Sequence, residues 1–104
     1  MLVRASAGTL FIRFKSRFGA SEAERLREAI LAFAPLSELV IDFTDVREFE
    51  DVAIVPLART LGGLKHVPVR LRGLTLHQAR MLRYFGIEAS NPAQDVAGAS
   101  AAGA

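Results

Sequence analysis

The segment LVIDF at residues 39–43 constrains the fold more than any other stretch of the sequence. It is apolar at every position except Asp42, so nearly both faces of a strand formed here need cover. Such a strand belongs in the centre of a sheet rather than at its edge. The segment therefore predicts a central strand, and the rest of the chain must supply its neighbours and its helices.

Two further segments have the alternating pattern of strands. Residues 9–15, TLFIRFK, place apolar side chains on one side and a partly polar set on the other. Residues 2–5 are predicted to pair with them as a hairpin through Ala7-Gly8. Residues 67–74, VPVRLRGL, alternate apolar positions with Arg70 and Arg72, which predicts a strand with a cationic exposed face. Pro68 suits the start of that strand or a sheet edge.

A first helix is predicted after the strand at 9–15. Ser21 and Glu24 have the spacing of a capping box, in which side chain and main chain exchange hydrogen bonds at a helix start. Pro35 ends the element. Its apolar stripe, which we expect to face the core, is Ala23, Leu26, Ile30 and Phe33.

Two more helices follow the central strand. One comes after an acidic turn and ends at Gly62-Gly63. The other begins with a second capping box, Thr75 to Gln78, and stops at Gly86. Its predicted inner face is Leu76, Ala79, Leu82 and Phe85.

The order β(β)-α-β-α-β-α predicts an α/β fold in which helical crossovers join parallel strands of one sheet. We expect a mixed four- to five-stranded sheet with three to four packed helices. Residues 1–88 form the single domain, and the Ala/Gly/Ser-rich segment 89–104 is predicted to be a disordered tail.

Composition narrows the classes of function. The chain has no cysteine, which excludes disulfides, thiolate metal sites and cysteine nucleophiles. No window has the roughly 20 apolar residues of a membrane span, and no secretory signal pattern is present at the start. We therefore expect a soluble cytoplasmic protein without a membrane span.

Charge is unevenly distributed along the chain. Residues 22–51 hold most of the acids, whereas the segments on either side are basic. Arg13, Lys15, Arg70 and Arg72 could form one basic sheet surface. Binders of single-stranded nucleic acid also need aromatic platforms between the basic residues, and only Phe11 is available here. Nucleic acid is thus an unfavoured partner.

No motif for catalysis, metal or cofactor binding emerges. His66 and His77 lack acidic or thiol neighbours at ligand spacing, and no nucleophile-elbow pattern is present. The paired glycines end a helix instead of opening one, unlike a phosphate-binding loop. Carboxylates cluster at the end of the central strand, with Asp42 in the strand and Asp45, Glu48, Glu50 and Asp51 predicted on the loop that follows. We interpret Asp51 as a helix N-cap and predict no catalytic residue, no metal site and no cofactor.

The central block SELVIDFTDVREFEDVAIVPLARTL resembles the core of STAS domains (sulfate transporter and anti-sigma factor antagonist). Asp42 fits the strand aspartate of that family, and Asp51 fits the aspartate before its phospho-acceptor. Val46 and Phe49 fit the apolar turn positions. The segments FGASEAERLREAI and VPVRLRGLTLHQARMLRYFGIE are similar to the helix before and to the strand and helix after, so the resemblance covers residues 9–88.

The departure from the family lies at the functional position. Where STAS domains have one or two hydroxyl residues and a glycine, this chain has Val52, Ala53 and Ile54. Neither Val52 nor Ala53 can accept a phosphoryl group, so the family's switch is absent. Pro56 adds a second peculiarity, because it cannot donate to the Val52 carbonyl. We expect a distorted or 3₁₀ first turn, or a helix that starts nearer Val55.

The resemblance implies a non-enzymatic protein-binding module of the anti-sigma factor antagonist or partner-switching kind. Its partner would be an anti-sigma factor, a serine-kinase-like protein, a subunit of a larger complex or, in a homodimer, a second copy of the chain. Three alternatives stay open: a scaffold subunit of a larger, for example transporter-associated, assembly; a basic-surface nucleic-acid module; and an enzyme with a pocket over Asp42 to Asp51. The predicted partner-binding residues are Glu50, Asp51, Val52, Ala53, Ile54 and Val55.

Overall fold

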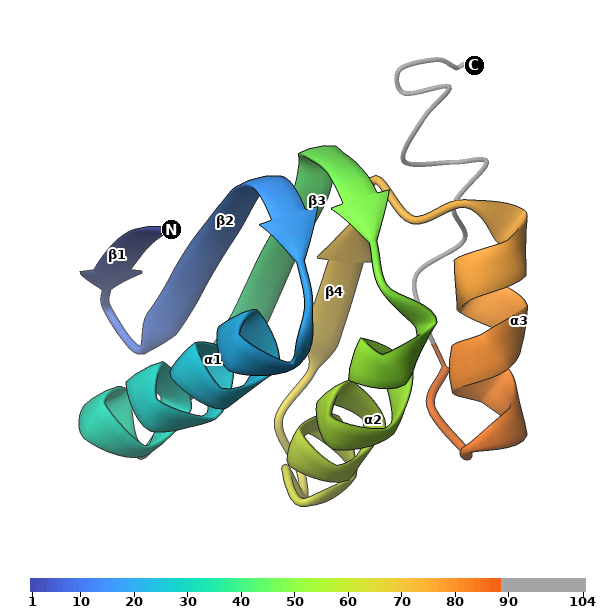
Figure 1. Cartoon of the computed structure of the whole chain (residues 1–104). Helices are drawn as coiled ribbons and strands as arrows, with labels where there is room; N and C mark the ends of the chain where they lie inside the picture. Colours follow the sequence, from blue (N-terminus) through green and yellow to red (C-terminus); the bar gives the residue numbers. More distant parts are fainter. Residues whose placement is uncertain (89–104) are drawn as a thin grey trace, which may run out of the picture.

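The chain folds into a four-stranded sheet with its helices gathered on one side, as shown by a computed structural model that describes residues 1–88 (Figure 1). The predicted tail at 89–104 lies outside the described residues. In chain order the elements are β1 (Leu2–Ser6), β2 (Thr9–Phe18), α1 (Ala20–Phe33), β3 (Glu38–Phe49), a 3₁₀ helix η1 (Asp51–Ala53), α2 (Ile54–Gly62), β4 (Val69–Arg72) and α3 (Leu76–Tyr84).

The sheet has the order β1-β2-β3-β4 and is mixed. β1 runs antiparallel to β2, whereas β2, β3 and β4 are mutually parallel. The predicted hairpin is confirmed, and its turn residues Ala7 and Gly8 have φ values of 50° and 85°, the left-handed conformation that a tight two-residue turn needs. β3 lies between β2 and β4, so the predicted central strand and the α/β architecture are also confirmed.

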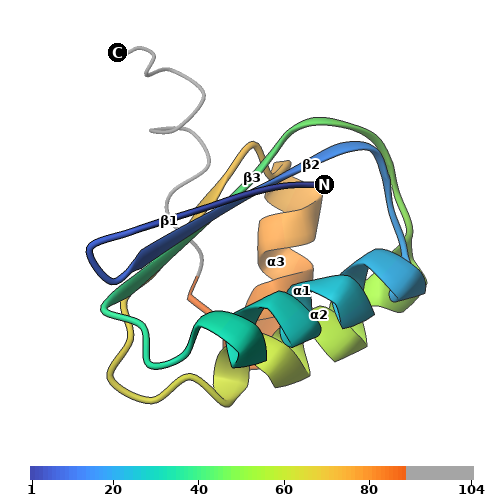
Figure 2. The same ribbon diagram turned by 90° about the vertical axis from the view of Figure 1, so that its left-hand side faces the viewer.

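Helices α1 and α2 lie side by side against one face of the sheet, and α3 stands beyond β4 next to α2 (Figures 1 and 2). The core fills the space between this helical layer and the sheet. Alternate residues of β2 and β3 point into it, as do the inner faces of α1 and α2. The largest fully buried side chains are Phe14, Phe18, Phe43, Leu10, Ile12, Leu26, Leu39, Ile41, Ile54, Leu57, Leu71 and Leu74.

β3 is longer than the sequence indicated. Its pairing with β2 continues to Phe49, across two register shifts, so Asp45 and Glu48 lie in the strand and not in a loop. Both strands bend over the starts of α1 and α2 (Figure 2). Four phenylalanines fill the inside of the bend, with ring centroids of neighbouring pairs 4.7–5.8 Å apart: Phe14, Phe18, Phe43 and Phe49. This aromatic cluster joins residues far apart in sequence, which a local pattern does not reveal.

The first helix starts earlier than predicted. It begins at Ala20, and the Glu22 carboxylate accepts a hydrogen bond from the Gly19 N–H at 2.8 Å. Ser21 is therefore not its cap, and Glu24 instead pairs with Arg27 at 2.6 Å. The predicted capping box of α3 is confirmed, because Gln78 N donates to Thr75 Oγ1 at 3.2 Å and Thr75 N donates to Gln78 Oε1 at 2.9 Å.

Three residues assigned to inner helix faces are exposed instead. They lie at helix ends, and they are Phe33, Leu76 and Phe85. The remaining members of both predicted stripes, among them Leu26 and Leu82, are buried as expected. Periodicity therefore identified the correct faces and overestimated how far each face is covered.

Candidate functional site

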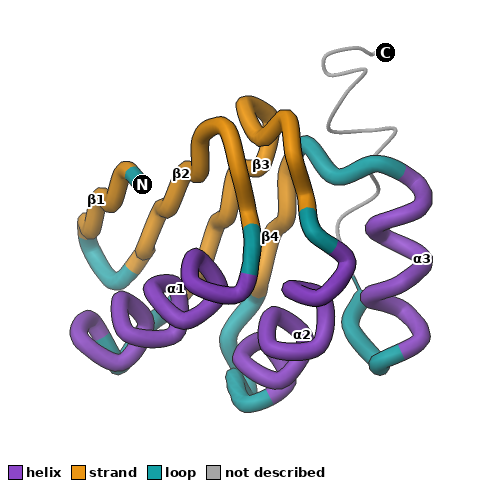
Figure 3. Tube along the Cα trace, in the orientation of Figure 1, coloured by secondary structure: helices purple, strands orange, loops and turns teal. Residues whose placement is uncertain are grey.

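The predicted site lies at the joint between β3 and α2, next to the end of β2 (Figure 3). Glu50 connects this joint to β2 through two contacts. Its N–H donates to the Phe18 carbonyl at 2.9 Å, and its carboxylate pairs with the Arg17 guanidinium at 2.6 Å. The start of α2 is thus attached to the end of β2 by main chain and side chain together.

The first turn after Glu50 is a 3₁₀ helix, as the position of Pro56 predicts. The Ala53 N–H donates to the Glu50 carbonyl at 2.9 Å, and α2 proper begins at Ile54. Pro56 then falls in the first α-helical turn, where a missing N–H costs nothing because that donor has no partner within the helix. The interpretation of Asp51 as the N-cap is wrong, since no side-chain hydrogen bond caps η1 or α2.

The six predicted partner-binding residues divide by exposure. Ala53 and Ile54 are buried in the core and offer no surface to a partner. Val52 is 64 % exposed and Val55 is 37 % exposed, although both are apolar. Asp51 is exposed beside them, and Glu50 is partly covered by its ion pair. The accessible part of the site is therefore two valines with an acidic neighbour.

Helix α3 contributes to the same surface, which the sequence did not indicate. His77 Nε2 lies 3.8 Å from Asp51 Oδ1, so the first turn of α3 stands beside η1. Leu76 precedes His77 and is 61 % exposed. We define the entrance surface as Asp51, Val52, Val55, Leu76 and His77. The signal for Leu76 was its place directly after the Thr75 cap, at the first position of a helix.

One carboxylate near the joint has a shifted pKa. The hydrogen bond from the Gly19 N–H holds the pKa of Glu22 below its ordinary value of 4.5, with Arg17 acting in the same direction. Gly19 is also packed against Glu50, so closely that a Cβ at position 19 would meet the Glu50 carboxylate. The starts of α1 and α2 are thereby coupled through charged groups.

Comparison with solved structures supports the fold assignment. The chain matches a serine-to-glutamate variant of RsbS, a STAS-domain protein from Moorella thermoacetica, with a TM-score of 0.63. The identity is 15 %, and the match covers 90 % of this chain and 88 % of that one. The chain has a STAS-like fold. No protein-family model and no curated protein matches the sequence.

In this STAS-like domain the two positions that the resemblance assigns to phospho-acceptors differ in access. The side chain of Val52 projects to the surface, whereas Ala53 has no exposed area. A hydroxyl at position 52 would be open to a kinase, and one at position 53 would lie inside the core. If both positions carried hydroxyl side chains, only that at position 52 would be accessible to a kinase in this conformation.

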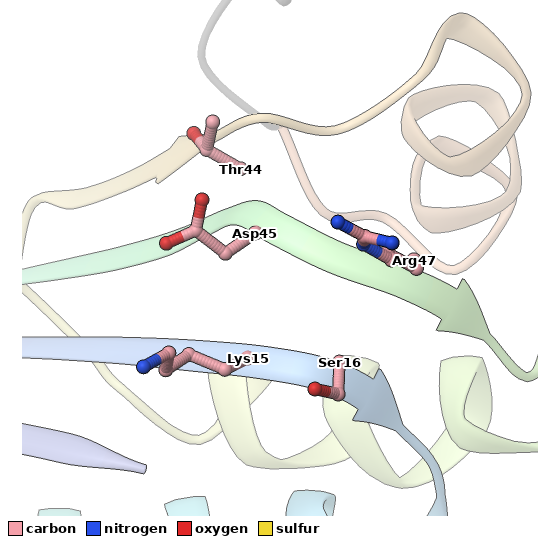
Figure 4. Close-up of a pocket in the computed structure, with 5 residues that line it drawn as sticks. All are labelled: Lys15, Ser16, Thr44, Asp45 and Arg47. Atoms are coloured by element: carbon pink, nitrogen blue, oxygen red, sulfur yellow. The ribbon is translucent and has the colours of Figure 1, made fainter.

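A surface hollow of about 480 Å³ lies where β2 and β3 begin to bend (Figure 4). Its lining is Lys15, Ser16, Thr44, Asp45 and Arg47, all of them exposed. Asp42 is buried beneath the sheet surface, 3.4 Å from Arg13, and accepts from the Thr44 N–H at 2.9 Å. The carboxylate in the lining of the hollow is that of Asp45. General acid and base catalysis by two carboxyls needs a pair of them in a partly dry site.

Between residues 1 and 88, no three side chains of the histidine, cysteine, aspartate and glutamate type come together at metal-binding distance. None of the helices in that range is both long enough and apolar enough to cross a membrane.

Proposed function

We propose that this STAS-like domain is a non-enzymatic protein-binding module that acts as an anti-sigma factor antagonist does, and that it binds its partner through the entrance surface. The observation that carries the proposal is the exposure of Val52, an apolar side chain at the position where the family has its phosphorylatable hydroxyl. Val52 is 64 % exposed on a turn that the Glu50 contacts hold in place, and an exposed apolar residue of this kind is suited to contact with another protein.

The proposed module binds constitutively. Phosphorylation adds a charge of about −1.5 to −2, which at this turn would stand beside Asp51 and disrupt an apolar interface. Valine and alanine at positions 52 and 53 cannot acquire that charge. The partner would be an anti-sigma factor, a serine-kinase-like protein or a subunit of a larger complex, in the cytoplasm.

The first test compares substitutions at two residues whose side chains are about equally exposed. Val52→Asp places a charge in the entrance surface, and Leu31→Asp places one on α1, where Leu31 is 63 % exposed. A partner captured with the wild-type chain is purified and titrated by calorimetry against all three proteins. We expect Val52→Asp to weaken binding by about a hundredfold and Leu31→Asp to have little effect. Equal affinity of the wild type and Val52→Asp would refute the proposal.

A second test addresses the missing switch. Incubation with the kinase-type partner and labelled ATP should leave the wild type unlabelled. Val52→Ser should accept the phosphoryl group, while Ala53→Ser should not, because residue 53 is buried. Stoichiometric labelling of the wild type at residues 51–54 would contradict a constitutive binder.

A second candidate function is a scaffold subunit. β1 forms one edge of the sheet and is largely exposed, so its outer side could pair with a strand of another chain. Light scattering after size exclusion would show a stable homodimer or larger oligomer if this edge is used. A monomer at all concentrations would remove the homo-oligomeric form of this candidate.

A further inference from the structure

The sheet face opposite α1 and α2 carries no helix from residues 1–88 (Figure 2). Strand register places its side chains in rows. One row runs Arg4, Phe11, Val40, Arg70 across the four strands, and the next runs Leu2, Arg13, Asp42, Arg72. Val40 and Asp42 are buried even though they lie on this bare face, because the long side chains around them cover them.

Basic residues outnumber acidic ones on the bare face. Its acids are Asp42, which lies 3.4 Å from Arg13, and Glu38, which lies 4.0 Å from Arg70. Within residues 1–88, Arg4, Lys15 and Arg72 have no acidic group at ion-pair distance. These three cations come from three different strands, so the uncompensated charge extends across the width of the sheet.

The hollow continues this face toward the bend (Figure 4). It adds the Arg47 guanidinium and the hydroxyls of Ser16 and Thr44 to the Lys15 ammonium. The backbone is locally distorted at the hollow. Ser16 has a left-handed φ of 68°, and the pairing of β2 with β3 shifts register just before Lys15 and just after Ser16. Strained conformations persist where the surrounding fold imposes them, and they are frequent at binding sites.

We propose that the bare face and the hollow bind an acidic polypeptide segment, at a site separate from the entrance surface. Carboxylates of the segment would pair with Arg4, Arg72 and Lys15, and one would enter the hollow between Lys15 and Arg47. These cations accept a carboxylate without first breaking an internal ion pair.

Nucleic acid fits this face less well. Among residues 1–88 the aromatic ring of this face is Phe11, and the Arg13 guanidinium lies 5.8 Å from its centroid, so these residues leave no free stacking platform. Asp45 lines the hollow and Glu38 lies on the face, where both would repel a continuous run of phosphates. A polypeptide can place neutral residues opposite these two carboxylates, and a polyphosphate cannot.

The test uses the full chain with two fluorescent probes, a glutamate oligomer in which every second residue is serine and an oligothymidylate of equal length. Anisotropy is measured between about 0.05 M and about 0.3 M salt, since screening weakens exposed charge pairs over this range. We expect the glutamate oligomer to bind at low salt, more tightly than the thymidylate. In the wild type, amide shifts on binding should be largest in β2 and β4.

A matched pair of double variants separates the site from net charge. Lys15→Glu with Arg72→Glu reverses two face cations, and Arg25→Glu with Arg59→Glu reverses two exposed arginines of the helical layer. The first pair should weaken glutamate binding by about tenfold or more, and the second by less than about threefold. Val52→Asp should leave it unchanged, which keeps this proposal independent of the entrance surface.

Several results would overturn the proposal. Tighter binding of the thymidylate would assign the face to nucleic acid, and equal losses in the two double variants would reduce the effect to net charge. Self-association that the face variant abolishes would make a second copy of the chain the occupant. Absence of glutamate binding at low salt, or shifts confined to α1 and α2, would also refute it. Lys15→Gln with Arg72→Gln is used if the Lys15→Glu, Arg72→Glu variant does not fold.

Discussion

Helices α2 and α3 begin in different ways, although each follows a strand of the same sheet. The start of α3 is stabilised by its own residues, through the two reciprocal hydrogen bonds between Thr75 and Gln78. The start of α2 has no side-chain cap at all. It is held by the Glu50 contacts with β2 and by the burial of Ala53 and Ile54.

The difference has a functional consequence. Because the start of α2 is stabilised from below by the core, the exposed residues Asp51 and Val52 are not needed for capping. They can be substituted without loss of the turn, and a partner can contact them without displacing a cap. The start of α3 keeps its own cap, formed by Thr75 and Gln78, beside this surface.

The largest expected effect comes from removing a buried side chain that holds the start of α2 against the core. Ile54→Ala should lower the free energy of unfolding by about 3 kcal/mol, because Ile54 is fully buried at the first position of the helix. Val55→Ala, one residue along and partly exposed, should cost less than about 1 kcal/mol. Urea unfolding measures both, and equal small losses would show that the core does not hold the turn.

Gly73 tests whether the start of α3 is wholly local. Its φ is 79°, and a Cβ there would collide with the Thr44 backbone of β3. Gly73→Ala should therefore cost about 2 kcal/mol or more. Gly62→Ala is the matched control, since Gly62 is helical and a Cβ there would make only an ordinary van der Waals contact with Ile87, and it should be neutral or slightly stabilising. If Gly73→Ala is as stable as the wild type, the close contact between Gly73 and Thr44 is not needed to position α3.

The caps themselves give a smaller and more specific contrast. Thr75→Ala should destabilise the protein by about 1 kcal/mol, because the Gln78 N–H loses its acceptor. Asp51→Ala should change stability by less than about 0.5 kcal/mol, since its carboxylate caps no N–H. Thermal unfolding of both variants decides the point. A loss at Asp51 as large as that at Thr75 would restore it as a cap.

Helix α1 provides the smallest effect, through pH. Folding lowers the pKa of Glu22, so the ionised group stabilises the native state above its ordinary pKa of 4.5. This contribution, about 0.5 kcal/mol for a partly exposed group, is lost as the pH falls through the lowered folded value. Glu22→Gln should therefore be less stable than the wild type at pH 7 and converge with it in acid. Parallel stability curves at all pH values would exclude this role for Glu22.

Features set by neighbouring residues could be predicted from the sequence. The Ala7-Gly8 turn, the Thr75 capping box and the distorted turn before Pro56 each depend on groups a few residues apart. The positions of the central strand and of the helices followed from periodicity, for the same reason. The resemblance to STAS domains rested on this order of elements, and the structural match to RsbS agrees with it.

Features that depend on distant residues could not be predicted. β3 extends to Phe49 because it pairs with β2 and joins the aromatic cluster. Asp51 loses its predicted role as a cap because it lies inside η1, where Glu50 takes the N-cap position. Leu76 reaches the entrance surface because the first turn of α3 stands beside η1.

The sequence by itself determined the type and order of the elements, and it excluded a phosphoryl acceptor at positions 52 and 53, because both follow from the chemistry of single residues and their neighbours. The tertiary structure decided which of these residues a partner can reach. Val52 and Ala53 are adjacent and both apolar, yet one is exposed and the other is buried. The difference arises because the turn η1, which follows β3, packs against the core with the side chain of Ala53 facing inward and that of Val52 facing outward. Only the folded chain fixes this orientation.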